Sequence, residues 1–415
     1  MAAAGSAVGL GNIWKFPYIA GENGGGAFLI VYLLCVLLFG MPLVATEFVI
    51  GKRSGASAYG AFRALNGDNR WQWLSWLCML TAIIIMGFYF VVTGWCFSYL
   101  AEAFTNNLGH DTAALTTHFA AVNANLPRVI VYSIIPVILT ATVLWFDVNK
   151  GIERLSKILM PLLLLLMVLM AGRVLMLEGS NVGMQFFFQT DFSKITPQVV
   201  LKAMGQCFFS LSIGMGALIT YGAYMPKNQS IVRTSIQVVV LDTLVAVMAG
   251  IIIFPAVFAF GFDPAEGPQL VFVVLPAIFD QMSFSWLSSV LFFSLLCIAA
   301  ITSTISLMEV AVAFICEATA QTKYPLNRRK SVTVVSILTI VLILLCVFIP
   351  RVFGTFDQLS SCLLMPLGAM GMSLFVGWKL SKNFNTWYGK VFVFAMRWIV
   401  PIAILIIFLD SLGLF

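Results

Sequence analysis

The feature that most constrains the fold of this chain is a series of apolar blocks, each about 20 residues long, along almost its whole length. A helix of about 20 residues crosses the roughly 30 Å of hydrocarbon in a bilayer, whereas barrel strands alternate apolar and polar residues over about 10 residues. Charged residues make up only 10% of the 415 positions, against roughly 25% in a soluble domain. We therefore expect an all-α membrane protein.

The blocks predict eleven transmembrane helices in a single domain over residues 1–415, because no linker or low-complexity segment separates them. Their approximate bounds are 1–20, 26–50, 74–103, 127–146, 155–177, 198–225, 231–262, 284–319, 332–351, 357–380 and 389–413.

The loops between these blocks alternate in their content of Lys and Arg. The loop after the second block holds Lys52, Arg53 and Arg63, whereas the loop that contains Asp263 and Asp280 has no basic residue. The positive-inside rule then places the N-terminus in the cytoplasm and the C-terminus outside. Because the net charge of +6 is spread over short loops, we expect a multi-pass protein of the lipid bilayer with no nucleic-acid partner.

Two of the predicted spans are interrupted by glycines with polar neighbours, at 5–12 (GSAVGLGN) and at 210–216 (SLSIGMG). Each Gly costs a helix about 1 kcal/mol relative to Ala, so the backbone is expected to leave the helix there and offer carbonyls and helix ends to ions and a zwitterion. Close packing of helices on Gly is the alternative. The breaks lie five spans apart, which predicts two five-helix inverted repeats, 1–177 and 198–380, and an extra helix at 389–413.

Four carboxylates lie within or at the ends of apolar runs, where ionisable groups are costly and usually functional: Glu47, Asp242, Glu309 and Glu317. Asp242 is a candidate ligand for a small cation or a proton, with a helix N-cap as the alternative. Glu47 is expected to tie helices together by hydrogen bonds, and Glu309 and Glu317 to form structural ion pairs.

Four hydroxyl residues crowd the eighth span within five positions: Thr302, Ser303, Thr304 and Ser306. Oxygen ligation of an alkali cation is one interpretation, because hard cations take oxygen ligands. Hydrogen bonding back to helix carbonyls is the other.

These motifs resemble the neurotransmitter:sodium symporter family. The run at 4–17 (AGSAVGLGNIWKFP) with 22–28 (ENGGGAF) is similar to the first helix of that family, and 205–212 (GQCFFSLS) to its sixth. The eleven spans and the segment 214–216 (GMG) resemble a bacterial branch that carries several hydrophobic amino acids. The resemblance implies the bacterial leucine transporter-like fold and a monomer in the plasma membrane of a bacterium that imports a neutral, hydrophobic or aromatic L-amino acid by sodium-coupled alternating access.

The resemblance also implies where two sodium ions and the substrate bind. One sodium site would use Ala7, Asn12, Ser210 and Asp242, and the other Gly5, Val8, Ala299, Thr302 and Ser303. The substrate would contact Ala7, Leu10, Gly11, Ile85, Tyr89, Phe209, Ser210, Ser212, Met215, Ser306 and Leu307, with Phe209 as its lid.

Moving parts follow from the same resemblance. Lys15 and Asp357 match an outer gate, and Tyr224 and Glu317 match part of an inner gate. Gly151 and Pro161 match an element of the fifth helix that unwinds to open the inner path.

Three departures from the family pattern carry information. Asp242 stands where Asn is typical, beside Tyr32, Gln206 and Ser210, which match the anion ligands of chloride-dependent members; its carboxylate is therefore expected to replace chloride. Gly9 leaves room for the carboxylate of an amino acid, where monoamine carriers have Asp. Only residues 1–4 precede Gly5, about 6 Å of helix at 1.5 Å per residue, so the inner half of the first helix is expected to be incomplete.

Other functions remain open on the residues alone. A proton-coupled transporter working through Asp242 is one alternative, and a channel or a transport-inactive sensor is another. An enzyme is not expected, because the sequence shows no Gly-rich phosphate loop and no catalytic triad, and its two His residues, His110 and His118, lie in one loop.

Overall fold

The computed structural model describes residues 8–67, 69–106, 112–146, 148–265, 270–281, 284–381 and 386–411. Regular structure in these residues is entirely helical. Among the described residues, nine helices are long and apolar enough to cross a membrane, which fits the predicted all-α membrane class. They cover Gly26–Ser54, Gln72–Thr105, Leu126–Trp145, Lys157–Leu175, Ile231–Ala259, Ser285–Thr319, Arg328–Phe348, Pro350–Trp378 and Gly389–Ile406.

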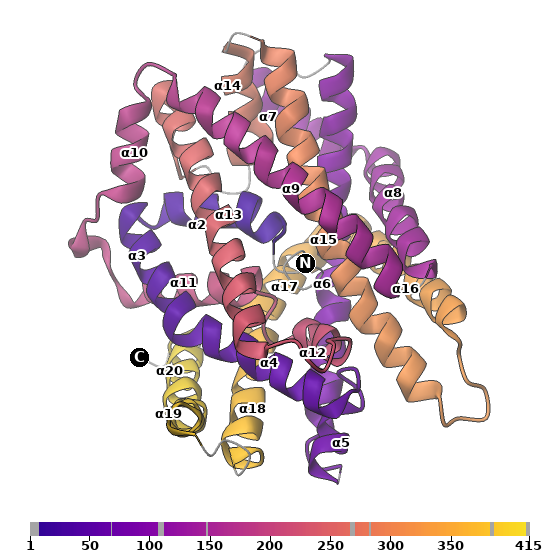
Figure 1. The fold of residues 1–415 in the computed structure, drawn as a ribbon. Helices are drawn as coiled ribbons and strands as arrows, with labels where there is room; N and C mark the ends of the chain where they lie inside the picture. The colour runs from indigo at the N-terminus through magenta and orange to yellow at the C-terminus, as the bar shows by residue number, and fades with distance from the viewer. Residues whose placement is uncertain are drawn as a thin grey trace.

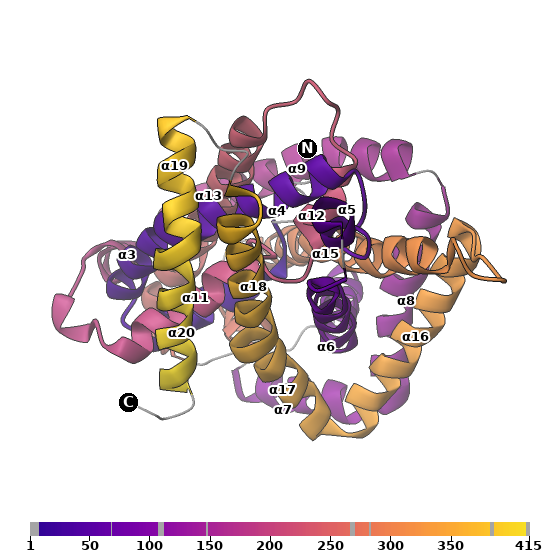
Figure 2. The ribbon, with the colours of Figure 1, turned by 90° about the horizontal axis from the view of Figure 1, so that it is seen from below.

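The long helices form one bundle around α6 (Gln72–Thr105) and α15 (Ser285–Thr319), which pack along each other. On one flank α8 (Leu126–Trp145) lies beside α16 (Arg328–Phe348), and on another α20 (Val400–Ser411) runs alongside α18 (Met365–Trp378) (Figures 1 and 2). Side chains on the outer surface are largely apolar, as lipid contact requires.

The predicted sixth span is interrupted where its glycines lie. Helix α11 (Pro197–Ser210) ends before a linker, 211–216, and α12 (Ala217–Ala223) follows it. Within the linker, φ is +55° at Ser212, +93° at Gly214 and +77° at Gly216. Left-handed backbone is open mainly to Gly, so the sequence itself ends the helix here.

Part of the first predicted span, including Gly5 and Ala7 of the expected break, lies outside the described residues. Its described part bends at Val8 and Gly9 and continues as a π-helical turn, η1 (Gly11–Lys15), and as α2 (Phe16–Glu22). A turn with positive φ at Gly24 and Gly25 then leads into α3 (Gly26–Cys35) and α4 (Met41–Ser54), joined by the π-helical η2 (Val36–Gly40).

The remaining spans follow the predicted positions with small shifts. Helix α9 (Val148–Leu175) and α13 (Ile231–Ala259) are continuous. The tenth predicted span begins earlier than expected, since α17 (Pro350–Leu359) starts at a proline, which is favourable in the first turn of a helix. A π-helical turn, η5 (Ser360–Leu364), joins α17 to α18, and α19 (Trp387–Phe394) with η7 (Ala395–Ile399) leads into α20.

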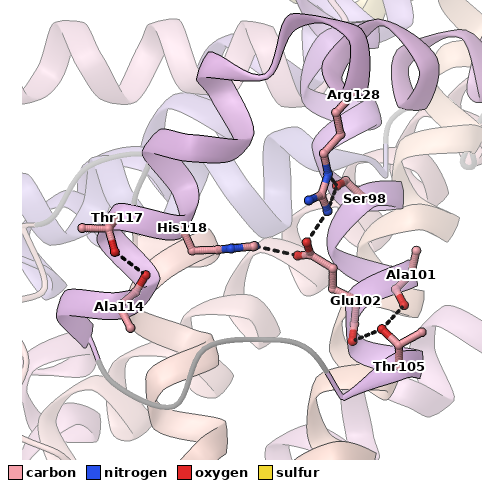
Figure 3. Close-up of polar contacts among 8 residues, drawn as sticks. All are labelled: Ser98, Ala101, Glu102, Thr105, Ala114, Thr117, His118 and Arg128. Carbon is pink, nitrogen blue, oxygen red and sulfur yellow. Dashed lines mark hydrogen bonds and ion pairs between the residues drawn. The ribbon is translucent and has the colours of Figure 1, made fainter.

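Short helices occupy the loops, where no helix was predicted: α5 (Ala61–Asn66), α7 (Thr112–Ala124), α10 (Ser180–Phe188), the 3₁₀ turn η3 (Phe192–Lys194), and η4 (Leu270–Val274) with α14 (Leu275–Gln281). Figure 3 shows how α7 is tied to the bundle. His118 of α7 and Arg128 of α8 both point to the carboxylate of Glu102 on α6, with 2.9 Å between His118 Nε2 and Glu102 Oε2. Arg128 also donates to the Ser98 hydroxyl at 2.8 and 3.0 Å.

Candidate functional site

A small cavity lies between the two helix breaks. Its walls come from Gly9 and the start of η1, from α6, from the end of α11 and the α11–α12 linker, and from α15 and α18. The residues that line it are Gly9, Gly11, Ile85, Tyr89, Phe209, Ser210, Ser212, Met215, Ser303, Leu307 and Met365. Most of the positions expected to contact a substrate are therefore brought together from four separate parts of the chain.

One end of the cavity is polar. The backbone amide of Leu10 donates to the hydroxyl of Tyr89 at 3.1 Å, at the point where the chain enters η1. Gly9 lies beside Ser303 and Tyr89, and a Cβ there would overlap the Ser303 hydroxyl. Backbone amides at the start of a helix attract anions, so this end suits a carboxylate.

Two described positions of the expected substrate set, Leu10 and Ser306, are not among the lining residues, and Ala7 lies outside the described residues. The Ser306 hydroxyl is bonded to the Tyr221 hydroxyl at 3.1 Å and to the Thr302 carbonyl at 3.0 Å. Met365 lines the cavity although no pattern in the sequence marked it.

Asp242 is fully buried in the middle of α13 and collects three side chains from other elements. Asn12 Nδ2 donates to its Oδ1 at 2.7 Å and to its carbonyl at 3.0 Å. Ser210 Oγ lies 3.1 Å from Oδ2, and Tyr32 donates to the same oxygen at 3.4 Å. The helix begins at Ile231, with Ser230 as its N-cap, so the alternative that Asp242 caps a helix is wrong.

Gln206, which the resemblance matches to an anion ligand of chloride-dependent members, donates from its amide nitrogen to the Gly11 carbonyl at 2.7 Å and so connects α11 to η1. Its match to an anion ligand stays a prediction. The cluster that surrounds Asp242 therefore consists of Asn12, Tyr32 and Ser210.

A second set of oxygens lies between the first break and α15. Thr302 Oγ1 is 3.2 Å from the Val8 carbonyl and 2.9 Å from the Ala299 carbonyl. Neutral carbonyl and hydroxyl oxygens suit a hard cation such as Na⁺, so the residues present fit the ion. Hydrogen bonding back to the helix also occurs, from Thr302 to Ile298 at 3.3 Å and from Thr304 to Ile301 at 3.0 Å. The fifth member of the expected set, Gly5, lies outside the described residues.

On one side of the cavity, Lys15 is buried in a contact with α17 and η5. Its Nζ lies 2.7 Å from Asp357 Oδ1, 3.0 Å from Ser361 Oγ and 4.2 Å from the centre of the Phe209 ring. Phe209 also lines the cavity. The pair expected to form a gate is thus in contact, directly above the expected lid.

Two carboxylates, Glu309 and Glu317, lie in the C-terminal part of α15. Arg328 holds both oxygens of Glu309, at 2.7 and 3.1 Å, which confirms the predicted ion pair, and Tyr224 donates to Glu309 at 2.8 Å. Glu317 accepts from the amide of Ser57 at 3.0 Å and from its hydroxyl. Tyr224 and Glu317 line one pocket but bond to different partners.

Two other predictions concern Glu47 and the helix that contains Gly151 and Pro161. The Gly214 amide donates to Glu47 at 2.7 Å, so Glu47 ties α4 to the α11–α12 linker by a hydrogen bond, as predicted. Gly151 and Pro161 lie in α9, which is helical from Val148 to Leu175, and its unwinding stays a prediction.

Comparisons with known proteins agree with this geometry. The chain matches the sequence profile of the "Sodium:neurotransmitter symporter family" over residues 1–125 and 121–409. It is 37% identical to the uncharacterized sodium-dependent transporter YhdH of Bacillus subtilis, over 100% of this chain and 96% of that protein. It is 31% identical to the uncharacterized sodium-dependent transporter MJ1319 of Methanocaldococcus jannaschii, over 93% and 82%. A crystal structure of MhsT in complex with L-phenylalanine matches with a TM-score of 0.91 and 39% identity, over 99% and 97% of the two chains.

Proposed function

We propose that this chain, which belongs to the sodium:neurotransmitter symporter family, imports neutral hydrophobic or aromatic L-amino acids together with two sodium ions. The observation that carries this proposal is the cavity between the two helix breaks, which is lined by Ser210 of the Asp242 cluster and by Ser303 next to Thr302. Such sites at discontinuous helices serve substrate and ion binding in transporters. The family consists of transporters and not of enzymes.

The substrate class is supported by the two ends of the cavity. Tyr89 and the backbone at Leu10 offer polar groups to a carboxylate, whereas Ile85, Met215 and Leu307 form apolar walls. MhsT, which is similar along almost the whole chain, was crystallised with L-phenylalanine. An amino acid with a large apolar side chain matches this combination of walls.

We assign one sodium ion to Asn12, Ser210 and Asp242, with the Ala7 carbonyl and the substrate carboxylate completing its ligands. The second ion is assigned to Val8, Ala299, Thr302 and Ser303, with the Gly5 carbonyl. In this arrangement Asp242 supplies the negative charge that chloride supplies in other members, so transport is chloride-independent. Hydrogen bonds from Asn12, Ser210 and Tyr32 hold this carboxylate in place.

Transport follows from alternating access. Contact of Lys15 with Asp357, above Phe209, closes the outer path. Unwinding of α9 between Gly151 and Pro161, with release of the contacts around Tyr224 and Glu317, opens the inner path. We place the chain in a bacterial plasma membrane as a monomer with eleven spans in two inverted repeats, its N-terminus in the cytoplasm and its C-terminus outside.

Uptake into proteoliposomes tests the proposal. Labelled phenylalanine and leucine are expected to accumulate with an inward sodium gradient and not with choline, with or without chloride. Uptake that follows a pH gradient in the absence of sodium would support proton coupling through Asp242 instead. Flux that never exceeds equilibrium would indicate a channel and contradict the proposal.

A further inference from the structure

One wall of the cavity comes from α18, an element that no sequence pattern connected with the substrate. Its first residue, Met365, lines the cavity and is 1% exposed. Met215 of the α11–α12 linker lines the same cavity and is 4% exposed. Two thioether side chains from distant parts of the chain therefore belong to one cavity.

The backbone behind Met365 is held in place by two glycines. A Cβ at Gly214 would overlap the Met365 carbonyl, and a Cβ at Gly368 would overlap the Gly214 carbonyl. The linker and the start of α18 are thus in direct backbone contact, which leaves little room for this wall to recede. Glu47 holds the same linker through the Gly214 amide.

The position of Met365 is also fixed along its own helix. The π-helical turn η5 precedes it, and Ser361 of that turn accepts from Lys15 at 3.0 Å. Pro366 follows Met365 in the first turn of α18. Because the backbone is fixed on both sides, only the side chain of Met365 can adapt to different occupants.

Met is suited to this role, since its unbranched thioether changes shape by bond rotation and contacts both aliphatic and aromatic groups. Ile85 and Leu307, which form other walls, are branched and stiffer. We infer that Met365 is a specificity-determining residue, which sets the largest side chain that the cavity accepts. This inference rests on the proposed function and adds a residue to it.

Two substitutions with opposite effects on volume test the inference. Met365→Ala enlarges the cavity, and Met365→Phe reduces it. A methylene more or less in an apolar pocket changes discrimination by about 10-fold to 200-fold. We therefore expect the ratio of tryptophan to valine uptake (as kcat/KM) to rise about tenfold or more with Met365→Ala and to fall by a similar factor with Met365→Phe.

The ratio is measured for two substrates in the same vesicles, so differences in the amount of folded protein cancel. Met372→Ala is the matched control, because Met372 is a fully buried Met of the same helix that does not line the cavity. Its uptake ratio is expected to equal that of the wild type. For a variant that does not transport, the ratio is taken instead from competition binding of the same two amino acids to the protein in detergent.

An unchanged ratio in both variants overturns the inference, and so does the loss of binding of every amino acid in both, since that result indicates a purely structural side chain. Wild-type protein that shows no sodium-dependent uptake of any amino acid contradicts the proposed function instead. The two failures are therefore distinguishable.

Discussion

At the scale of single residues, Asp242 has the largest consequence for ion coupling. Its carboxylate is enclosed by Asn12, Tyr32 and Ser210, with no cationic side chain among these contacts. A buried carboxylate without a basic partner is costly, which supports a bound cation as its companion. We therefore propose that the Asp242 carboxylate takes the place of the chloride ion that other members of the family require.

The substitution Asp242→Asn tests this role. The substitution removes the negative charge and keeps the shape of the side chain. We expect uptake by this variant to be slow without chloride and about tenfold or more faster with chloride, because the anion then balances the sodium charge. Glu47→Gln is the control, since Glu47 is equally buried but contacts Gly214. Chloride-free uptake equal to that of the wild type in Asp242→Asn would count against anion replacement.

Residue positions were predictable from the sequence to different degrees. The resemblance to the symporter family implied that Tyr89, Phe209 and Met215 contact the substrate, and all three line the cavity. Met365 was not predictable, since a Met that begins a buried helix looks like any core residue. The hydrogen bonds of Ser306 to Tyr221 and of Gln206 to the Gly11 carbonyl join residues far apart in the chain, so the sequence alone did not indicate them.

At the scale of elements, hydrophobic length predicted the long helices well, because the bilayer thickness fixes it. The loop helices α5, α7, α10 and α14 were missed because segments of 6 to 13 residues carry too little periodicity to be distinguished from loops. The predicted ends of helices were less accurate: α17 begins at Pro350, whereas the predicted span begins at residue 357. Apolar and polar residues mix where a helix leaves the hydrocarbon, so the apolar pattern does not mark the end sharply.

Helix α9 offers a test of the inner path at this scale. Pro161 lies inside the helix and removes a backbone hydrogen bond, a loss of about 3 kcal/mol relative to Ala. Pro161→Ala is expected to stabilise the helical state, so uptake should fall about tenfold or more while sodium-dependent binding persists. Pro136→Ala in α8 is the comparison, because Pro136 also lies within a helix. Equal effects of the two substitutions on uptake would contradict the proposal that unwinding of α9 opens the inner path.

The attachment of α7 is a matter of stability rather than transport. The Glu102 carboxylate contacts both His118 and Arg128 (Figure 3). The Glu102 side chain is 11% exposed. Glu102→Gln leaves the Arg128 charge uncompensated, and unfolding is expected to become easier by about 1–3 kcal/mol. Thermal unfolding in detergent measures this change, with Glu178→Gln on the surface as the control. Identical melting temperatures for Glu102→Gln and the wild type would show that the cluster contributes nothing.

At the scale of the whole molecule, the two breaks bring the ends of distant helices to one place. Asn12 and Ser210 both donate to Asp242, and Thr302 donates to the Val8 carbonyl, although these residues are spread over most of the chain. We propose that sodium and the substrate carboxylate share ligands, so that the binding of each raises the affinity for the other.

Equilibrium binding of phenylalanine to the purified protein over a series of sodium concentrations tests that claim most directly. The dissociation constant of phenylalanine is expected to fall as sodium replaces choline, and phenylalanine should raise sodium affinity by the same factor, about 5-fold to 150-fold for a coupling energy of 1–3 kcal/mol. A phenylalanine dissociation constant that is the same in sodium and in choline would contradict the account.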